Sequence, residues 1–226
     1  MRPIILILVF ALTACPDAPR NVSAKGDAII WVHGGGFTKG SPAAQNLMGL
    51  ESALPDIDHY RPTYTLSTES VSGYQLNIRE ISAEVEYRRS QARHVILAGT
   101  SAGATIAFHA AVLGDHEPDG LILFYGLYDF SRPQDFNFPD DDERISQYFG
   151  QYDSLLNSPV NQARSLHIPV LLVHGIDDET VSAEQTRILA GLLPSKSVYP
   201  VAGHSFPVVD EADIIRTWMR ETFDER

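Results

Sequence analysis

Short runs of mainly apolar residues recur along the chain, and each is followed closely by a glycine. The runs occupy residues 28–32, 95–98, 121–125, 170–173 and 197–200. Runs that are apolar on both faces of a strand are typical of a parallel sheet that helices cover on each side. A further strand is expected within residues 55–66, although Pro55 and Pro62 obscure its limits.

Apolar residues return at helical spacing in the segments between these runs. The clearest examples are residues 74–85, the alanine-rich residues 102–113, residues 188–192 and residues 214–219. Gly114 follows the second of these segments and is a typical helix terminator. The alternation of strands and helices predicts an α/β fold, with a mostly parallel sheet of about six strands and helices on both faces.

Residues 129–166 have no strong period, and we expect them to form an insertion near the mouth of a functional site. They contain the acidic run 140–143, which we interpret as a solvated loop. This run lacks the ligand spacing and the glycine of a calcium-binding EF-hand loop. The chain has no internal repeat and no low-complexity linker, which favours a single domain over residues 25–226.

The N-terminus has the pattern of an export signal. Arg2 precedes an apolar run at residues 4–12, and L-T-A-C follows at residues 12–15. The run is shorter than the ~20 apolar residues that a membrane span needs. Residues 12–15 resemble the lipobox of bacterial lipoproteins, which implies cleavage after residue 14 and a lipid on Cys15. The alternatives are an ordinary signal peptide with an incidental cysteine, or an unprocessed buried strand.

This interpretation divides the chain into a signal peptide at residues 1–14, a proline-containing tether at 15–24 and the folded domain at 25–226. It places the protein outside the cytoplasm of a bacterium, in the periplasm or anchored to the inner or outer membrane. The lipid would be its sole membrane contact.

Charge and cysteine content narrow the function classes. Lys and Arg total 17 against 29 Asp and Glu, which gives a formal net charge of −12. This balance argues against a nucleic-acid-binding protein, whose affinity comes mainly from basic residues. Cys15 is the single cysteine, so an intramolecular disulfide is excluded, and no zinc-finger pattern is present. We expect no metal site.

A nucleophile motif, G-T-S-A-G, occupies residues 99–103, between an apolar run and an alanine-rich helix. In the G-x-S-x-G motif the serine sits on a tight strand-to-helix turn that exposes its hydroxyl. The helix N-terminus below it favours developing negative charge. Alone, the motif could also be a tight turn or a helix cap that contains a serine. As a nucleophile motif, it points to Ser101.

A glycine cluster, H-G-G-G, follows the first apolar run at residues 33–36. Consecutive glycines let backbone N–H groups point into a pocket, as acyl transfer requires where a carbonyl oxygen becomes an oxyanion. The residues fit neither the P-loop nor the dinucleotide-binding pattern. His33 is expected to brace this loop. The two motifs together predict a serine hydrolase far more specifically than either alone.

The remaining members of a triad should follow in the order acid, then histidine. Asp177 and Asp178 come after the run at 170–173, and His204 comes after the run at 197–200. Both positions lie beyond strand ends, where α/β proteins place their sites. Four other histidines adjoin or lie within predicted elements and are interpreted as surface or core residues: His94, His109, His116 and His167.

Over residues 28–222 the chain resembles the α/β-hydrolase superfamily. The resemblance is to its H-G-G-G branch, which contains hormone-sensitive-lipase-like esterases, feruloyl-esterase-like hydrolases and kynurenine formamidases. It implies a Ser101–Asp178–His204 triad, since the family pattern H-G-x-x-D-x-x-V at residues 174–181 selects Asp178 over Asp177. It also implies oxyanion donors, which are the backbone amides of Gly34, Gly35 and Ala102.

Two features depart from this family. Thr100 stands where these branches more often have Asp or His, which leaves the subfamily open. The chain also reaches the H-G-G-G strand directly, so we expect a reduced sheet without the usual first antiparallel strands.

The resemblance implies a carboxylesterase that acts on a small-molecule acyl substrate through an acyl-enzyme on Ser101, without a cofactor. An arylformamidase or a peptidase could use the same triad. A catalytically silent, lipid-anchored binding protein on the same scaffold is a further alternative. The specificity segments carry no readable motif, although Phe37, Phe136, Phe138 and Tyr148 are candidates for an acyl pocket.

Overall fold

The computed structural model describes residues 25–224, so the predicted signal peptide at 1–14, Cys15 and the rest of the predicted tether lie outside the described residues. Six parallel strands form one sheet in the order β2-β1-β3-β4-β5-β6. The strands are β1 (Asp27–Val32), β2 (Ile57–Tyr60), β3 (Val95–Thr100), β4 (Gly120–Phe124), β5 (Val170–Val173) and β6 (Ser195–Val198). The predicted α/β architecture of about six strands is confirmed.

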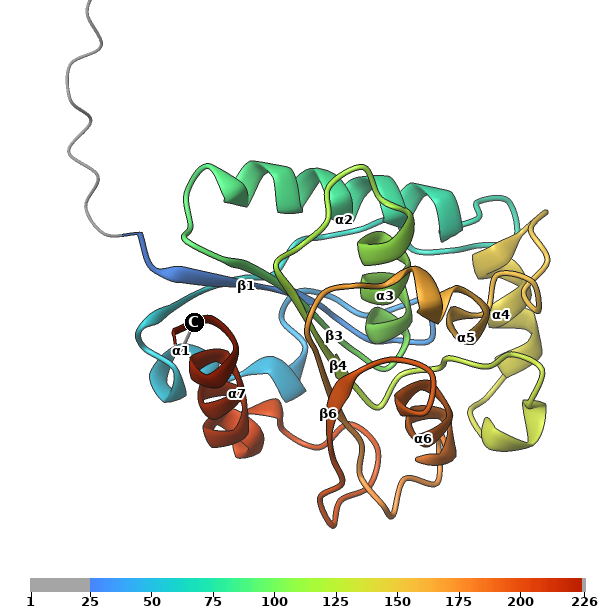
Figure 1. The fold of residues 1–226 in the computed structure, drawn as a ribbon. Coiled ribbons are helices and arrows are strands. Elements are labelled where there is room, and N and C mark those ends of the chain that lie inside the picture. The colour runs from blue at the N-terminus through green and yellow to red at the C-terminus, as the bar shows by residue number, and fades with distance from the viewer. Residues whose placement is uncertain (1–24, 225–226) are drawn as a thin grey trace, which may run out of the picture.

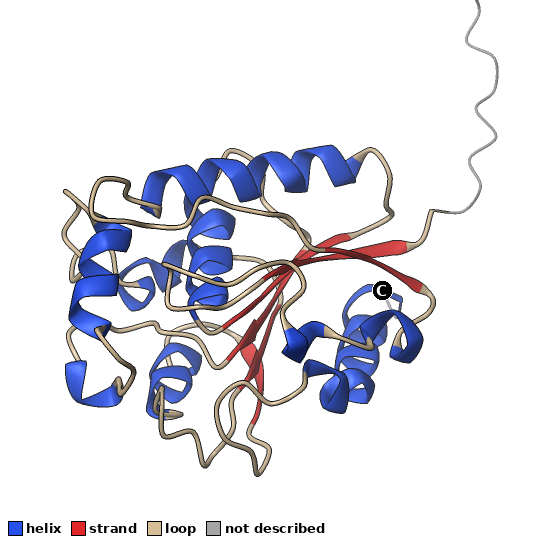
Figure 2. Cartoon of the chain, turned by 180° about the vertical axis from the view of Figure 1, so that it is seen from behind, coloured by secondary structure: helices blue, strands red, loops and turns tan. Residues whose placement is uncertain are grey.

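Helices cover both faces of this sheet (Figures 1 and 2). They are α1 (Leu50–Ala53), α2 (Tyr74–Arg89), α3 (Ala102–Leu113), α4 (Asp141–Phe149), α5 (Pro159–Gln162), α6 (Glu184–Ala190) and α7 (Ala212–Met219). The core on one face joins the strands to α2, α3 and α6, and the core on the other joins them to α1 and α7. Figure 2 shows the sheet between these two layers.

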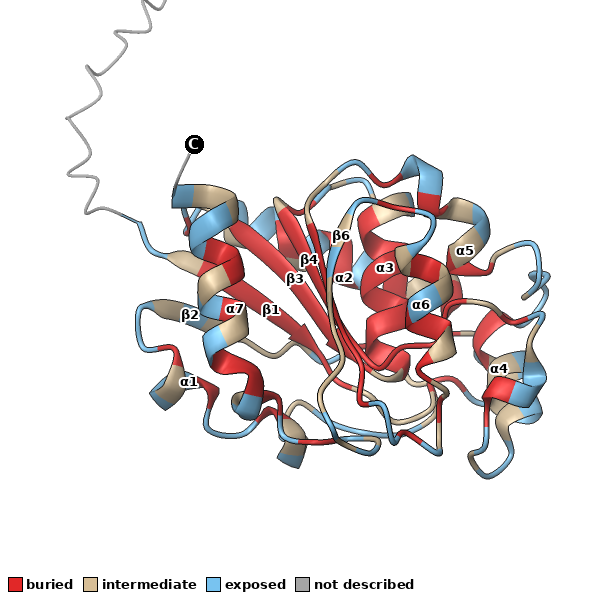
Figure 3. Cartoon of the chain, turned by 60° about the horizontal axis from the view of Figure 1, so that its bottom comes forward, coloured by how far each residue is buried: buried red, intermediate tan, exposed pale blue. Residues whose placement is uncertain are grey.

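The central strands are apolar on both faces because each face meets a helix layer. Ile30 and Leu97 belong to the core beneath α2 and α3, whereas their neighbours Ile29 and Ile96 belong to the core beneath α7. Every residue of β3 and β4 is buried, as Figure 3 shows for the strands at the centre of the sheet. This double burial explains why these strands read as continuous apolar runs in the sequence.

At the edges of the sheet, β6 is shifted from its predicted run, whereas β2 lies within the stretch in which a strand was expected. β6 begins at Ser195, two residues before the predicted run, and ends before Pro200, which has no N–H to donate to a ladder. An edge strand tolerates polar residues, and Lys196 reaches outward to Glu221, with 3.0 Å between Nζ and Oε2. β2 occupies only Ile57–Tyr60 of the broad stretch in which a strand was expected.

The segment at residues 129–166 is more ordered than its sequence suggests, since it contains α4 and α5. Its acidic run was interpreted as a solvated loop. Asp140, Asp142 and Glu143 are exposed, as expected, but the run is helical and the prediction of a loop is wrong. Asp141 begins α4, and Asp141, Asp142 and Glu143 form its first turn. Carboxylates in a first helical turn are stabilised by the free N–H groups and the helix dipole there. Within residues 25–224, every helix is too short or too polar to span a bilayer.

Candidate active site

Ser101 lies on the turn between β3 and α3, in a strained backbone conformation with φ 53° and ψ −127°. Its N–H donates to the Phe124 carbonyl oxygen at 2.9 Å, which ties the turn to β4. A Cβ on Gly99 would lie 2.2 Å from the Gly103 oxygen, and one on Gly103 would lie 2.2 Å from the Val32 oxygen. The turn therefore requires both glycines of the G-x-S-x-G motif, because backbones meet there without room for a side chain.

The structure brings Ser101, His204 and Asp178 into one hydrogen-bonded chain. His204 Nε2 lies 3.0 Å from Ser101 Oγ, and His204 Nδ1 lies 2.6 Å from Asp178 Oδ2. The carboxylate accepts a hydrogen bond from the Nδ1–H group, which keeps the proton on Nδ1 and leaves Nε2 free to accept the hydroxyl proton of Ser101. This is the geometry of a nucleophile, a general base and an orienting acid.

Asp178 is held by four hydrogen-bond donors, and its side chain is fully buried. Oδ1 accepts the backbone N–H groups of Thr180 and Val181, both at 2.9 Å. Burial alone would raise the pKa of this carboxyl. Hydrogen bonds from His174 and His204 and the charge of His204 together outweigh that effect, so the pKa lies well below its ordinary value. Asp178 is therefore ionised, whereas Asp177 beside it is exposed.

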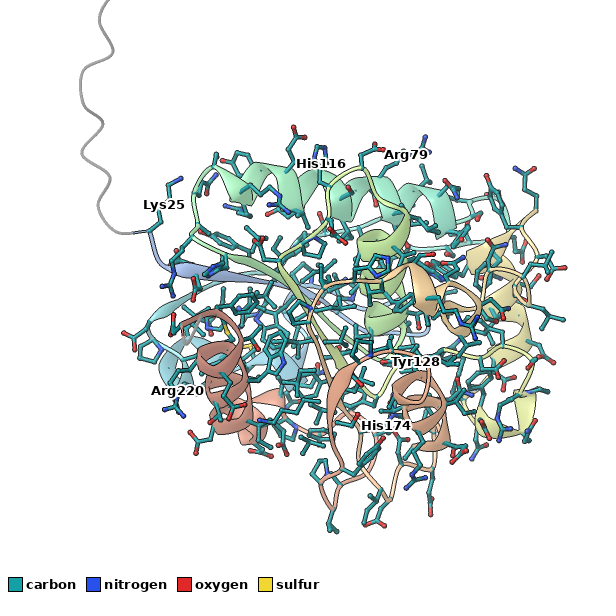
Figure 4. The ribbon with its side chains drawn as sticks, in the orientation of Figure 1. Lys25, Arg79, His116, Tyr128, His174 and Arg220 are labelled. Atoms are coloured by element: carbon teal, nitrogen blue, oxygen red, sulfur yellow. The ribbon has the colours of Figure 1, made fainter. Side chains whose placement is uncertain are left out.

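His174 is a site residue to which the sequence analysis gave no role. Its ring is fully buried, with Nδ1 2.7 Å from Thr186 Oγ1 and Nε2 2.9 Å from the Val181 oxygen. Nε2 also lies 3.2 Å from Asp178 Oδ2, so the Nε2–H group donates to both the Val181 oxygen and the carboxylate. Figure 4 labels this histidine in the lower part of the view, near α6. The signal was present, because His174 opens the H-G-x-x-D pattern.

The glycine loop at residues 33–36 is held by an aromatic clamp. The Tyr64 hydroxyl donates to the His33 oxygen at 2.7 Å, and the two rings stack with centroids 4.3 Å apart. His33 Nδ1 lies 2.8 Å from the Gly34 oxygen. Burial lowers the pKa of His33, which suits a neutral ring that donates to this oxygen. These contacts agree with the bracing role expected of His33.

A cavity of about 310 Å³ opens in front of Ser101. It is lined by the glycine loop, by the nucleophile and histidine loops, and by residues from elsewhere, namely Lys39, Ala44, Asn46, Tyr125, Leu127, Phe138, Pro139, Arg144 and Thr180. Of the four aromatic residues considered for an acyl pocket, only Phe138 lines this cavity. Phe37 and Tyr148 are buried and stack on each other, with ring centroids 4.2 Å apart, and Phe136 packs against Phe130.

Tyr125 forms one wall of the cavity, although the sequence analysis placed it only at the end of a strand. Its backbone has φ 40°, an uncommon value for a bulky residue. Its ring meets His204 edge-on at 4.9 Å between centroids. Its hydroxyl accepts a hydrogen bond from Asn46 at 2.8 Å, and burial raises its pKa, so it remains a neutral phenol. Tyr125 therefore packs beside the imidazole without adding charge.

The other histidines have the surface or core positions expected of them. His94 pairs with Asp27 and His116 with Glu86, while His109 is buried in α3 and His167 is exposed. Across residues 25–224, no group of three or more histidine, cysteine or acidic side chains could hold a metal ion.

A nucleophilic serine after the third strand in the chain, with an acid and a histidine after later strands, is the arrangement of the α/β-hydrolase fold, and this chain has that fold. The chain belongs to the BD-FAE family, whose model matches residues 17–193. That match includes Ser101 and Asp178 and ends before His204.

Known proteins resemble the chain at low identity. A kynurenine formamidase from Meyerozyma guilliermondii is 25% identical in an alignment 199 residues long, which covers 79% of this chain and 76% of the relative. Thermogutta terrifontis esterase 2, phosphonylated by sarin, superposes with a TM-score of 0.72 at 19% identity, over 88% of this chain and 84% of the other.

An acetyl ester-xyloside bifunctional hydrolase from Caldicellulosiruptor lactoaceticus superposes with a TM-score of 0.67 at 18% identity. That likeness covers 88% of this chain and 84% of the other. At these identities, the two structural likenesses establish a shared fold.

Proposed function

We propose that this protein hydrolyses carboxylic esters of small molecules through an acyl-enzyme formed on Ser101. The observation that carries the proposal is the continuous hydrogen-bonded chain from Ser101 through His204 to a buried, ionised Asp178. That chain opens into a cavity large enough for a small ligand. Serine hydrolases need this combination of activated nucleophile and adjacent binding space.

In the first step, Ser101 Oγ attacks the ester carbonyl carbon while His204 Nε2 takes the hydroxyl proton. Asp178 holds the imidazole in the required tautomer and stabilises the imidazolium that forms. The tetrahedral intermediate collapses when His204 returns the proton to the leaving alcohol, and the acyl group remains on Ser101. Water then attacks this ester with His204 again as base, and the carboxylic acid leaves.

The oxyanion of each tetrahedral intermediate is assigned to the backbone amides of Gly34, Gly35 and Ala102. Gly34 and Gly35 line the cavity, and a Cβ on Gly34 would lie only 3.0 Å from Ser101 Cβ. Ala102 is the first residue of α3, where a backbone N–H has no partner within the helix. One such donor typically contributes ~3 kcal/mol to transition-state stabilisation.

The test combines a fluorophosphonate probe with p-nitrophenyl acetate. We expect the folded protein to be labelled and to cleave the ester, and Ser101→Ala to lose both by several orders of magnitude. Ser90→Ala is the control, since Ser90 is exposed at the end of α2. Undiminished activity in Ser101→Ala would overturn the proposal, and a wild-type protein that neither reacts nor cleaves would support the silent binding protein.

Formamide hydrolysis is a second candidate, because a relative 25% identical to this chain is a kynurenine formamidase. The triad would serve both reactions, so the leaving group decides between them. A phenyl ester and the matching N-formyl anilide should be compared by kcat/KM. We expect the ester to be preferred, and a preference for the formyl anilide would replace esterase with arylformamidase activity.

We also propose that the protein is exported and lipid-anchored through Cys15. The support is the charged start, short apolar run and L-T-A-C pattern of residues 1–15. Expressed in a Gram-negative host, the wild type should partition into detergent and Cys15→Ser into the aqueous phase. Intact mass would show whether diacylglycerol is present, and an unmodified wild-type Cys15 would overturn the anchor.

A further inference from the structure

The described side chains that line the cavity in front of Ser101 include two basic groups and no acidic one. Lys39 and Arg144 both line it, and no Asp or Glu of the described chain does. This is unexpected in a protein with 29 acidic and 17 basic residues. A concave site with one sign of charge attracts ligands of the opposite sign.

Arg144 comes from α4 and lies against the glycine loop. A Cβ built on Gly36 would lie 3.0 Å from Arg144 Nη1 and 3.3 Å from its Cδ. The same loop touches the nucleophile at its other end, where a Cβ on Gly34 would lie 3.0 Å from Ser101 Cβ. The glycine loop therefore lies against both the guanidinium and the nucleophile, and both residues line the same cavity.

The Arg144 guanidinium is only weakly neutralised. Its side chain is 16% exposed, and Asp140 Oδ2 lies 3.8 Å from Nη2 on a side chain that is 68% exposed. An ion pair with such an exposed carboxylate is strongly screened by water. This ion pair is the one polar contact of the guanidinium within residues 25–224, so its donors remain available to a ligand.

Lys39 supplies a second charge at the same loop. Its backbone N–H donates to the Gly35 oxygen at 3.2 Å, which fixes its position relative to the glycines. Its side chain is exposed and forms no ion pair with any residue in the described range 25–224. The exposed ammonium of Lys39 contributes long-range attraction. The largely buried guanidinium of Arg144 can bind a carboxylate in a bidentate manner.

We propose that this site selects esters that carry a carboxylate, which Arg144 binds directly and Lys39 attracts. The inference rests on the proposed esterase function and names its substrate class. Leu127, Phe138 and Pro139 also line the cavity. These apolar neighbours favour a carbon chain between the ester and its carboxylate, and they strengthen the charge pair by excluding water.

The carboxylate can belong to the acyl group or to the alcohol, and two substrate pairs distinguish these sources. p-Nitrophenyl hydrogen adipate against p-nitrophenyl hexanoate tests the acyl side. 4-Acetoxybenzoate against its methyl ester tests the alcohol side. The quantity measured is the ratio of kcat/KM for the charged ester to kcat/KM for the neutral one, taken within each variant, so that a general loss of activity cancels.

In at least one pair, Arg144→Gln should lower this ratio about ten- to a hundredfold, as expected for the loss of a charged hydrogen bond. Lys39→Gln should lower it less, and Arg144→Lys should retain part of it. Arg79→Gln should leave it unchanged, because Arg79 is exposed on α2, on the upper side of the molecule in Figure 4.

Two results would overturn the inference, and they are distinguishable. If the wild type cleaves the neutral esters but Arg144→Gln has the wild-type ratio in both pairs, the carboxylate site is wrong and the esterase function stands. If the wild type cleaves none of the four esters, the proposed function itself fails and the inference fails with it.

Discussion

His174 and His109 form the same local structure in two different parts of the molecule. Both rings are fully buried. In each, Nε2 faces a backbone oxygen at 2.9 Å, that of Val181 for His174 and that of Asn157 for His109. In each, Nδ1 faces a hydroxyl, at 2.7 Å for Thr186 and 3.1 Å for Tyr148. The partners fit an imidazole with its proton on Nε2.

The two histidines differ in one additional neighbour. His174 Nε2 also lies 3.2 Å from Asp178 Oδ2, whereas the partners of His109 are neutral groups from residues 148 and 157. The same arrangement therefore fastens the 129–166 segment to α3 in one place and fixes Asp178, the proposed triad acid, in the other. The role of a buried histidine therefore depends on its hydrogen-bond partners, which include a carboxylate for His174 and only neutral groups for His109.

Replacing the Asp178 carboxylate should have the largest effect on kcat, because it removes the proposed triad acid. It also leaves His174 with only neutral partners, as His109 has. Asp178→Asn should lower kcat about ten-thousandfold, the typical cost of this change in a Ser-His-Asp triad, since an amide stabilises the wrong imidazole tautomer. Steady-state hydrolysis of a p-nitrophenyl ester measures this. Asp177→Asn is the matched control, and a larger loss in that variant would show that the acid is assigned one residue too late.

Replacing each histidine in turn should separate their roles. His174→Gln should lower kcat about ten- to a hundredfold with KM little changed, because a displaced Asp178 misaligns His204. His109→Gln should change kcat at pH 7 by less than about threefold. Active-site titration with a fluorophosphonate corrects both values for unfolded protein. Equal losses of kcat in the two variants after this correction would show that His174 has no specific role in holding Asp178.

The smallest expected effect is that of His109 on how the free energy of unfolding depends on pH. Burial lowers the pKa of His109 to about 4, from 6.5 in an unfolded chain. Between these values the unfolded state binds more protons, so stability is full above pH 6.5 and is lost as pH falls towards 4. His109 should account for about 3 kcal/mol of this loss.

Urea unfolding at pH 7 and pH 4 measures that loss. The difference in the free energy of unfolding between the two pH values should shrink by about 3 kcal/mol in His109→Gln, although the variant is less stable at pH 7. An unchanged difference would show that His109 is protonated without cost in the fold, and the comparison with His174 would then lose its basis.

The sequence predicts those parts of the molecule in which the fold restricts the residue types within a short segment. Gly99 and Gly103 are needed where backbones touch, so the turn that carries Ser101 is visible as a motif. α3 has the bounds expected from its composition, residues 102–113. The doubly buried strands are visible for the same reason, because both faces demand apolar residues.

The missed features depend on contacts between distant segments. Tyr125 looks like the end of an apolar strand, and its role beside His204 arises only when β4 and the histidine loop meet. Arg144 lies in α4, a short helix that the sequence analysis did not predict, and its place at the glycine loop comes from the folding of residues 129–166. The spacing of residues along the chain does not show which distant segments will be in contact in the fold.

One consequence of the 129–166 segment concerns how such a protein can diverge. This segment runs from β4 to β5 and contributes Phe138, Pro139 and Arg144 to the cavity wall, while the triad residues stand at turns and loops beside the strands. Substitutions in the segment can therefore change which molecules fit without moving the nucleophile. Selection can act on ligand preference and on reactivity almost separately, because the chain encodes them in different stretches.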